Sequence, residues 1–222
     1  TVIGQSVVGT AVGALVGGLV TAFIVYLLAY RRGVQGFRLI IVGIGVTAVL
    51  NAVNTYLLLR ASTEVALGAS IWGAGSISLV AWPQAWPALV GLAVMVPLTA
   101  LLSRPLRQLE LGDDSARAHG LRVEPARLGI LVVGVTLMAL VTATSGPIAF
   151  VALAAPQIAR RLTRSAGIPI TASALVGSVI LLGADTVAQH AFSNPVPVGL
   201  VTVVVGGIYL LILLVREARE AL

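Results

Sequence analysis

The 222-residue chain contains no cysteine and no lysine, and only 10% of its residues are charged. The absence of cysteine excludes disulfides, thiolate metal sites and cysteine nucleophiles from this sequence. Without lysine, the phosphate-binding pattern GxxxxGK[ST] cannot occur, so we expect no ATPase site of that kind in the chain. The sequence also lacks an HExxH motif and a Ser/His/Asp set. We therefore expect a protein that is not an enzyme.

Apolar residues dominate what remains. Hydrophobic residues make up 58% of the chain, and the mean hydropathy is +1.04. A soluble domain cannot bury so much apolar surface, so the solvent must be lipid. A helix needs about 20 apolar residues to cross the hydrocarbon. The sequence predicts an all-α, polytopic transmembrane bundle with spans at Ala11–Tyr30, Leu39–Leu59, Pro87–Leu102, Leu128–Thr144, Pro147–Ala159, Ile170–Ala188 and Val198–Val215.

The positions of the arginines give the direction of these spans. Cytoplasmic loops carry the excess of Lys and Arg. In the seven-span arrangement, Arg60 lies alone on one side, and the other arginines all gather on the opposite side: Arg31, Arg32, Arg38, Arg104, Arg107, Arg117, Arg122, Arg127, Arg160, Arg161, Arg164, Arg216 and Arg219. That side is predicted to be cytoplasmic, and it includes the C-terminus. Membrane orientation thus accounts for the net charge of +6 without a nucleic-acid partner.

A few polar side chains fall inside the predicted spans. Thr47, Asn51 and Asn54 are spaced four and three residues apart, so they share one face of a helix. In hydrocarbon this face must contact protein or water, as the wall of a translocation pathway or as an interhelical hydrogen-bonding surface. Asp185 is the only acid well inside a span, with Gln189 and His190 nearby. It fits either an ion relay or a structural carboxylate.

The stretch LELGDDSARAHGL, residues 109–121, interrupts the apolar pattern within a polar cytoplasmic segment at 104–127. Asp113 or Asp114 is expected to cap the N-terminus of a short helix, and Gly120 to end it in the left-handed conformation. Leucines stand on both sides of this helix. The pattern is typical of a helix that docks in a groove of a partner protein, and a solvated loop is the alternative.

Five ordered motifs, added to the LGDDSARAHGL insert, resemble one family across essentially the whole chain. They are RLIIVGIGVTAVLNAV from Arg38, IWGAGSIS from Ile71, SGPIAFVALAAPQIAR from Ser145, ASALVGSVILLGADTVAQ from Ala172 and PVPVGLVTVVVGGIYLLILL from Pro195. The chain resembles FecCD-type permease subunits of bacterial ABC importers for iron–siderophores, haem and vitamin B12. The resemblance implies a type II importer permease with about ten spans, so residues 1–222 would form one permease domain that lacks its first three spans.

The family also implies partners for this chain. A second permease subunit, identical or different, would enclose the pathway with it in the plasma membrane. Two cytoplasmic ATPase subunits would hold the ATP and Mg²⁺, and the permease itself would carry no cofactor and no metal. A substrate-binding protein would dock on the outer side.

The resemblance assigns roles to individual residues. The coupling segment would contact the ATPase through Leu109, Glu110, Leu111, Gly112, Asp113, Asp114, Ser115, Ala116, Arg117, Gly120 and Leu121. The pathway would be lined by Thr47, Asn51 and Asn54. Residues 72–78 would form a short outer helix and loop, and the binding protein would dock on Arg60, Glu64, Trp72, Gln189 and His190. Gln157 replaces a histidine that is common in the family, and this points to the catecholate (enterobactin-type) branch.

These observations lead to the hypothesis that the chain imports an iron(III)–siderophore complex, driven by a separate ATPase. Import of vitamin B12 or haem is the alternative within the same class. An ion-coupled secondary transporter would need coupling-ion sites, for which Asp185 is the sole candidate. A scaffold subunit that transports nothing is the remaining alternative.

The predicted topology can be tested by accessibility labelling. His119 and Arg161 lie in two different cytoplasmic segments of the predicted arrangement. Reagents that do not cross the membrane are expected to reach both positions only from the cytoplasmic side. Reaction of either position exclusively from outside the cell would invert the predicted topology.

Overall fold

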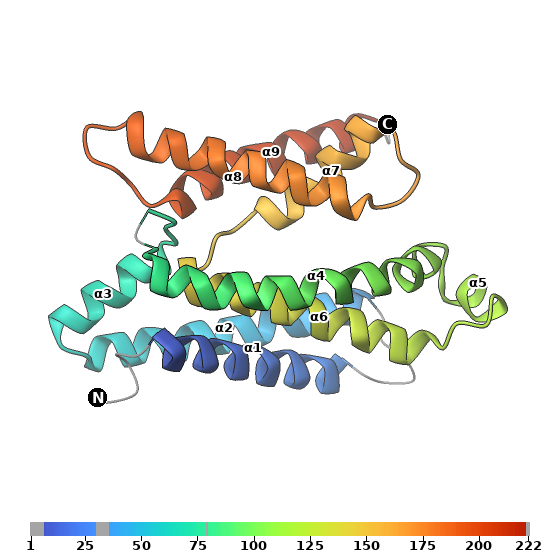
Figure 1. Cartoon of the computed structure of the whole chain (residues 1–222), viewed down its shortest axis with the longest axis horizontal. Helices are drawn as coiled ribbons and strands as arrows, with labels where there is room; N and C mark the ends of the chain where they lie inside the picture. Colours follow the sequence, from blue (N-terminus) through green and yellow to red (C-terminus); the bar gives the residue numbers. More distant parts are fainter. Residues whose placement is uncertain (1–6, 30–35, 79, 221–222) are drawn as a thin grey trace. The chain divides into compact units, whose positions relative to one another are not determined.

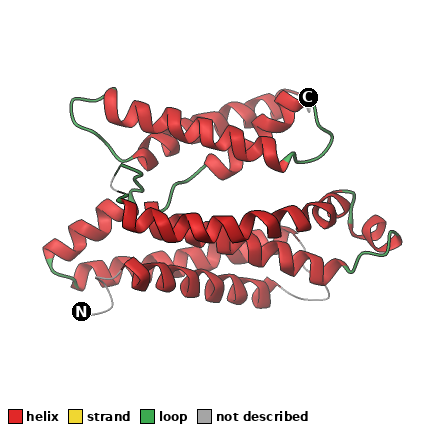
Figure 2. Cartoon of the chain, in the orientation of Figure 1, coloured by secondary structure: helices red, strands yellow, loops and turns green. Residues whose placement is uncertain are grey.

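A computed structural model describes residues 7–29, 36–78 and 80–220 of the chain. Within these ranges every regular element is a helix (Figure 2). Arg31 and Arg32, which entered the charge argument, lie outside the described residues, as do the side chains of Arg216 and Arg219. The helices are α1 (Val7–Ala29), α2 (Gly36–Arg60), α3 (Thr63–Gly73), α4 (Trp82–Glu110), α5 (Asp113–Ala118), α6 (Val123–Ser145), α7 (Val151–Thr163), α8 (Ile170–His190) and α9 (Val198–Glu220).

The helices fall into two compact units (Figure 1). The first unit comprises residues 1–70 and 81–144, which include α1, α2, α4, α5 and α6. The second comprises residues 71–80 and 145–222, which include α7, α8 and α9. The expectation of a single permease domain over residues 1–222 stays a prediction.

Each predicted span overlaps one helix. Among the described residues, five helices are long and apolar enough to cross a membrane: α1, α2, α4, α6 and α8. The described apolar part of α9, Val198–Tyr209, is shorter. The all-helical, membrane-spanning class predicted from hydropathy is therefore confirmed.

Helix α7 differs most from its predicted span. It begins at Val151, four residues later than expected, and its 13 residues rise only about 20 Å. The hydrocarbon core is about 30 Å thick. Residues 146–150 before the helix are not helical, and five residues add at most about 18 Å. A crossing here, as the arginine distribution predicts, needs both these residues and the helix.

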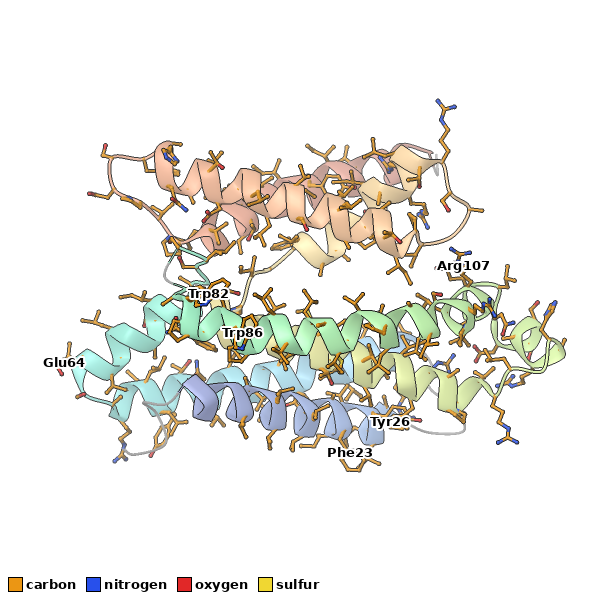
Figure 3. All side chains as sticks on the ribbon, in the orientation of Figure 1. Phe23, Tyr26, Glu64, Trp82, Trp86 and Arg107 are labelled. Atoms are coloured by element: carbon orange, nitrogen blue, oxygen red, sulfur yellow. The ribbon has the colours of Figure 1, made fainter. Side chains whose placement is uncertain are left out.

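Helix α4 is longer than the span Pro87–Leu102 predicted from hydropathy. It continues from Trp82 to Glu110 without interruption. Hydropathy underestimated its length because apolar residues mark the part of a helix that lies in hydrocarbon, and a helix can continue beyond that part. Its 29 residues correspond to about 43 Å, more than the hydrocarbon thickness. The Trp82 and Trp86 rings lie 6.2 Å apart on the first turns (Figure 3), where aromatic residues favour the membrane interface.

In the second unit, three of the quoted motifs meet backbone to backbone. The Ser76 N–H donates to the carbonyl oxygen of Ser145 at 2.7 Å, and the Gly199 N–H donates to that of Gly75 at 3.0 Å. A Cβ at Gly199 would overlap the carbonyl of Ala74, and one at Gly146 would overlap the carbonyl of Trp72. Both positions require glycine because any side chain there would keep the two backbone segments apart.

A second close contact joins α7 to α9. Phe150, which immediately precedes α7, has a φ of 68°, a conformation that bulky residues rarely adopt. Its side chain occupies the space that Gly206 leaves open, since a Cβ on Gly206 would overlap the Cβ and Cγ of Phe150. The neighbouring Gly207 has no atom within 4 Å of an added Cβ.

Adjacent glycines in α9 therefore provide a matched test of this packing. Gly206→Ala is expected to destabilise the subunit by about 1–3 kcal/mol, the usual cost of overpacking. Gly207→Ala makes the same chemical change one residue later and is expected to be close to neutral. Thermal unfolding of the detergent-solubilised subunit measures both. Equal melting temperatures for the two variants would contradict the described Phe150–Gly206 contact.

Candidate functional site

The polar segment predicted at 104–127 forms three consecutive pieces at one end of the first unit (Figure 1). Its first residues, up to Glu110, are the last two turns of α4. The short helix α5 follows after the turn at Leu111 and Gly112, and α6 begins at Val123. The prediction of a short ordered helix between Gly112 and Gly120 agrees with the structure, whereas Leu109 and Glu110 belong to the preceding membrane helix.

The expected aspartate cap at the start of α5 is wrong. The residue before the helix is Gly112, with φ 95° and ψ 155°, and no side chain caps the helix. Asp113 and Asp114 are the first two helical residues. Their carboxylates still lie at the positive end of the helix dipole, where negative charge is favourable. The Asp113 carboxylate has a different partner, an arginine in α6.

The end of α5 agrees with the prediction. Gly120 has a φ of 82°, and it closes the helix with two backbone hydrogen bonds. The Gly120 N–H donates to the carbonyl of Arg117 at 2.9 Å, and the Leu121 N–H donates to that of Ala116 at 3.0 Å. This pair of bonds is the Schellman arrangement, which depends on a left-handed residue.

Charged side chains connect α5 with α6. The Nη2 of Arg127 donates to both carboxylate oxygens of Asp113, at 2.7 and 3.0 Å. Arg127 also lies 3.6 Å from the Glu124 carboxylate. On α5 itself, Arg117 pairs with Asp114 at 3.0 Å and with Asp113 at 3.9 Å. Arg127 lies outside the motif at 109–121, 14 residues after Asp113. The motif therefore gave no sign of the contact between these two residues.

The two faces of α5 differ in exposure. Ala116 is 1% exposed and anchors the helix against the rest of the unit. Leu111 is 70% exposed, and most of the predicted coupling residues are exposed as well, including Glu110, Gly112, Asp114, Ser115, Arg117 and Gly120. An exposed leucine beside exposed charges forms a surface on which a partner protein can dock.

The predicted pathway residues lie on α2. Thr47, Asn51 and Asn54 are all exposed in this chain, on one side of the helix. In hydrocarbon, exposed Asn side chains need water or a second protein surface. Their role in a pathway stays a prediction.

The predicted docking residues are divided between the two units. In the first, the Arg60 guanidinium stacks 5.4 Å from the centre of the Tyr56 ring, and Glu64 lies in the first turn of α3. The short outer helix was expected from Trp72 onward. In the structure it runs from Thr63 to Gly73, so Trp72 lies near its end.

In the second unit, the end of α8 carries a hydrogen-bonded pair. The Nε2 of Gln189 donates to the Asp185 carboxylate at 2.6 Å. The Nδ1 of His190 lies 3.1 Å from the carbonyl oxygen of Thr186. Of the two readings of Asp185, this contact favours the structural carboxylate. Among the described residues, no three His, Cys, Asp or Glu side chains are grouped in a way that could hold a metal ion.

Comparison with known proteins extends over almost the whole chain. The FecCD transport family matches residues 1–216. The ferric enterobactin transport system permease protein FepG of Escherichia coli (strain K12) is 49% identical over 218 residues, which are 98% of this chain and 66% of FepG. The iron(3+)-hydroxamate import system permease protein FhuG of Bacillus subtilis (strain 168) is 39% identical over 199 residues, 88% of this chain and 59% of FhuG.

A solved structure has the same fold. It is an ABC transporter of the metal-chelate type in an inward-facing conformation, with a TM-score of 0.83 and 24% sequence identity. The match covers 96% of this chain and 69% of that chain. The chain therefore spans about two thirds of the length of the proteins it resembles.

The closure of α5 at Gly120 can be tested by amide hydrogen exchange. Valine at a positive φ costs about 1–2 kcal/mol, so Gly120→Val is expected to speed exchange at residues 116–121 by about tenfold. Gly120→Asn is expected to have a smaller effect, because asparagine tolerates the left-handed conformation. Unchanged exchange in the valine variant would contradict the described closure.

Proposed function

The chain belongs to the FecCD transport family, and on that premise we propose that it is part of a permease subunit that imports iron(III)–siderophore complexes. The observation that carries the proposal is 49% identity to a ferric enterobactin permease over 98% of the chain. A hydroxamate permease is less similar, at 39%. The cargo proposed here is therefore a catecholate siderophore of the enterobactin type.

The proposed complex contains permease subunits, ATPase subunits and a binding protein. This subunit and a second permease subunit, identical or different, enclose the pathway in the bacterial plasma membrane. Two cytoplasmic ATPase subunits bind ATP and Mg²⁺, and an extracytoplasmic binding protein delivers the cargo. The C-terminus of this chain lies in the cytoplasm, on the side where the arginines gather.

Segment 104–127 supports an ATP-driven mechanism. Helix α5 is short, closed at Gly120 and surrounded by exposed side chains, and it connects directly to two long apolar helices. When the ATPase subunits close on ATP, they displace α5, and α4 and α6 carry the displacement across the membrane. Those helices change their packing, and the pathway opens to the other side.

The pathway itself needs little chemistry. The iron arrives already chelated, so the wall requires no metal ligands. Thr47, Asn51 and Asn54 offer a weakly polar surface on α2, which suits a large solute that must be bound only briefly. Selection of the cargo is then left mainly to the binding protein.

Vitamin B12 or haem as cargo remains the alternative within the same class, because the pathway residues do not distinguish these solutes. An ion-coupled carrier is disfavoured by Asp185, whose carboxylate already accepts a hydrogen bond from Gln189 at 2.6 Å. Uptake that depends on a proton gradient and is insensitive to ATP depletion would favour that carrier. Co-purification with an ATPase and a binding protein would count against a scaffold role.

The proposal is tested by growth under iron starvation. A strain lacking the full-length subunit is supplied with single purified siderophores, and expression of the subunit is expected to restore growth on a catecholate siderophore. Failure on every siderophore, with growth restored on haem or with uptake of vitamin B12 instead, would contradict the proposed cargo.

The same strain tests the role of α5. Gly112→Pro removes the hydrogen bond from the Gly112 N–H to Leu109 (3.1 Å) and cannot adopt φ 95°. Uptake is expected to fall about tenfold, within the range that coupling mutations span, while the membrane level of the subunit and ATP hydrolysis persist. Asp113→Arg is expected to lower uptake in the same way while the membrane level and ATP hydrolysis persist. Gly134→Ala, which meets no atom within 4 Å in α6, is the control. Wild-type uptake in Gly112→Pro would remove α5 from the mechanism.

A further inference from the structure

Helix α5 lies between two glycine turns. Gly112 precedes it with φ 95°, and Gly120 follows it with φ 82°. An added Cβ at either glycine has no atom within 4 Å, so the side-chain position is open at both turns, whose backbone hydrogen bonds are made within the segment itself. Buried Ala116 anchors the six-residue helix at one point. A second contact, at the start of the helix, is needed to fix its direction.

The contact that bridges the second turn is the ion pair between Asp113 and Arg127. It joins the first residue of α5 to the second turn of α6, and it does so with one guanidinium nitrogen donating to both carboxylate oxygens at 2.7 and 3.0 Å. The Asp113 side chain is 37% exposed and that of Arg127 is 23% exposed. Both side chains are therefore partly shielded from the water and salt that weaken fully exposed ion pairs.

The same arginine is itself held by α6 and is linked to α1. The Glu124 carboxylate lies 3.6 Å from Nη1 of Arg127, and its Oε2 accepts a hydrogen bond from the Tyr26 hydroxyl at 3.5 Å. Tyr26 lies in the last turns of α1 (Figure 3). Polar contacts therefore run from α5 through the start of α6 to the end of α1.

Asp114 shows that this arrangement is specific to one of two neighbouring aspartates. Its side chain is fully exposed, and its partner is Arg117 on the same helix. Asp113 faces α6, and Asp114 faces solvent. The two adjacent aspartates therefore make different contacts: Asp113 binds Arg127 of α6, and Asp114 binds Arg117 on the surface of its own helix.

We propose that Arg127 is a positioning residue that locks α5 to α6 through Asp113, so that a displacement of α5 is delivered to α6. The lock rests on the proposed function, in which an ATPase displaces α5. Without it, α5 still contacts the ATPase, and ATP is still hydrolysed. The movement is then absorbed at Gly112 and Gly120 and does not reach the membrane helices.

The first experiment measures coupling in the complete complex. The full-length permease, its ATPase and its binding protein are reconstituted in proteoliposomes, and siderophore uptake is divided by ATP hydrolysed. Arg127→Gln is expected to lower this ratio about fivefold, which corresponds to a coupling of about 1 kcal/mol. Retention of the ATPase on the purified complex separates this effect from lost docking.

Two further variants make the comparison specific. Arg122→Gln removes the same charge from the neighbouring turn, at an exposed residue outside the ion-pair network, and is expected to leave the ratio unchanged. The exchange Asp113→Arg with Arg127→Asp reverses the pair, and it is expected to recover most of the loss seen in either single variant. An Arg127→Gln ratio equal to that of Arg122→Gln, or an exchange variant no better than the single variants, would overturn the proposal.

The second experiment does not depend on transport. Residues 1–222 contain no cysteine, so once any cysteine elsewhere in the full-length subunit is replaced, spin labels are placed at Ala118→Cys and Pro125→Cys, two exposed positions on α5 and α6. In the full-length subunit in nanodiscs, Arg127→Gln is expected to broaden the distance distribution between the labels, and Arg122→Gln is not. An unchanged distribution contradicts the lock even if transport fails. A wild-type complex without ATP-driven uptake contradicts the proposed function and leaves the spin-label result to judge the lock.

Discussion

The hydrocarbon of the membrane offers the backbone no hydrogen-bonding partner, and this constraint accounts for most of the structure. Each long apolar segment becomes a helix, which satisfies its own N–H and C=O groups. Hydroxyl side chains within the spans follow the same rule by donating to a carbonyl one turn earlier, as Thr99 does to Met95 at 2.8 Å and Thr136 to Val132 at 2.7 Å. Among the described residues, no buried side-chain polar atom lacks a hydrogen-bond partner.

The second unit shows what is needed where the chain leaves the helical form. Residues 74–78 and 146–150 are not helical, and their backbone groups must find partners in other segments. Ser76 reaches Ser145, and Gly199 reaches Gly75, because glycines at the crossing points allow two backbones to touch. The segments IWGAGSIS, SGPIAF and PVPVG, far apart in the sequence, thus meet in one set of backbone contacts.

Hydropathy located the five described helices that are long and apolar enough to cross a membrane, because the apolar character that lipid requires is a local property of each segment. It did not locate helix ends: α4 continues to Glu110, since a helix in water needs only favourable local residues to persist. Gly120 was recognisable as a stop because the left-handed conformation selects glycine at one position. The role of Asp113 was not recognisable, since a rule for capping considers neighbours only. Its partner, Arg127, lies in α6, and the contact between them is evident only in the three-dimensional structure.

The choice of α6 as the partner of α5 also has a mechanical reason. Helix α4 contains Pro87, Pro97 and Pro105, and each proline removes a backbone hydrogen bond that would resist bending. Helix α6 has its single proline, Pro125, in the first turn, where the missing N–H has no partner to lose. A displacement passed to α4 meets three weakened points, whereas one passed to α6 meets an unbroken ladder of hydrogen bonds across the membrane. An ionic contact from α5 to α6 therefore connects the exposed helix to the neighbour whose interior lacks proline, and in the proposed mechanism bending of α4 would let the bundle repack around it.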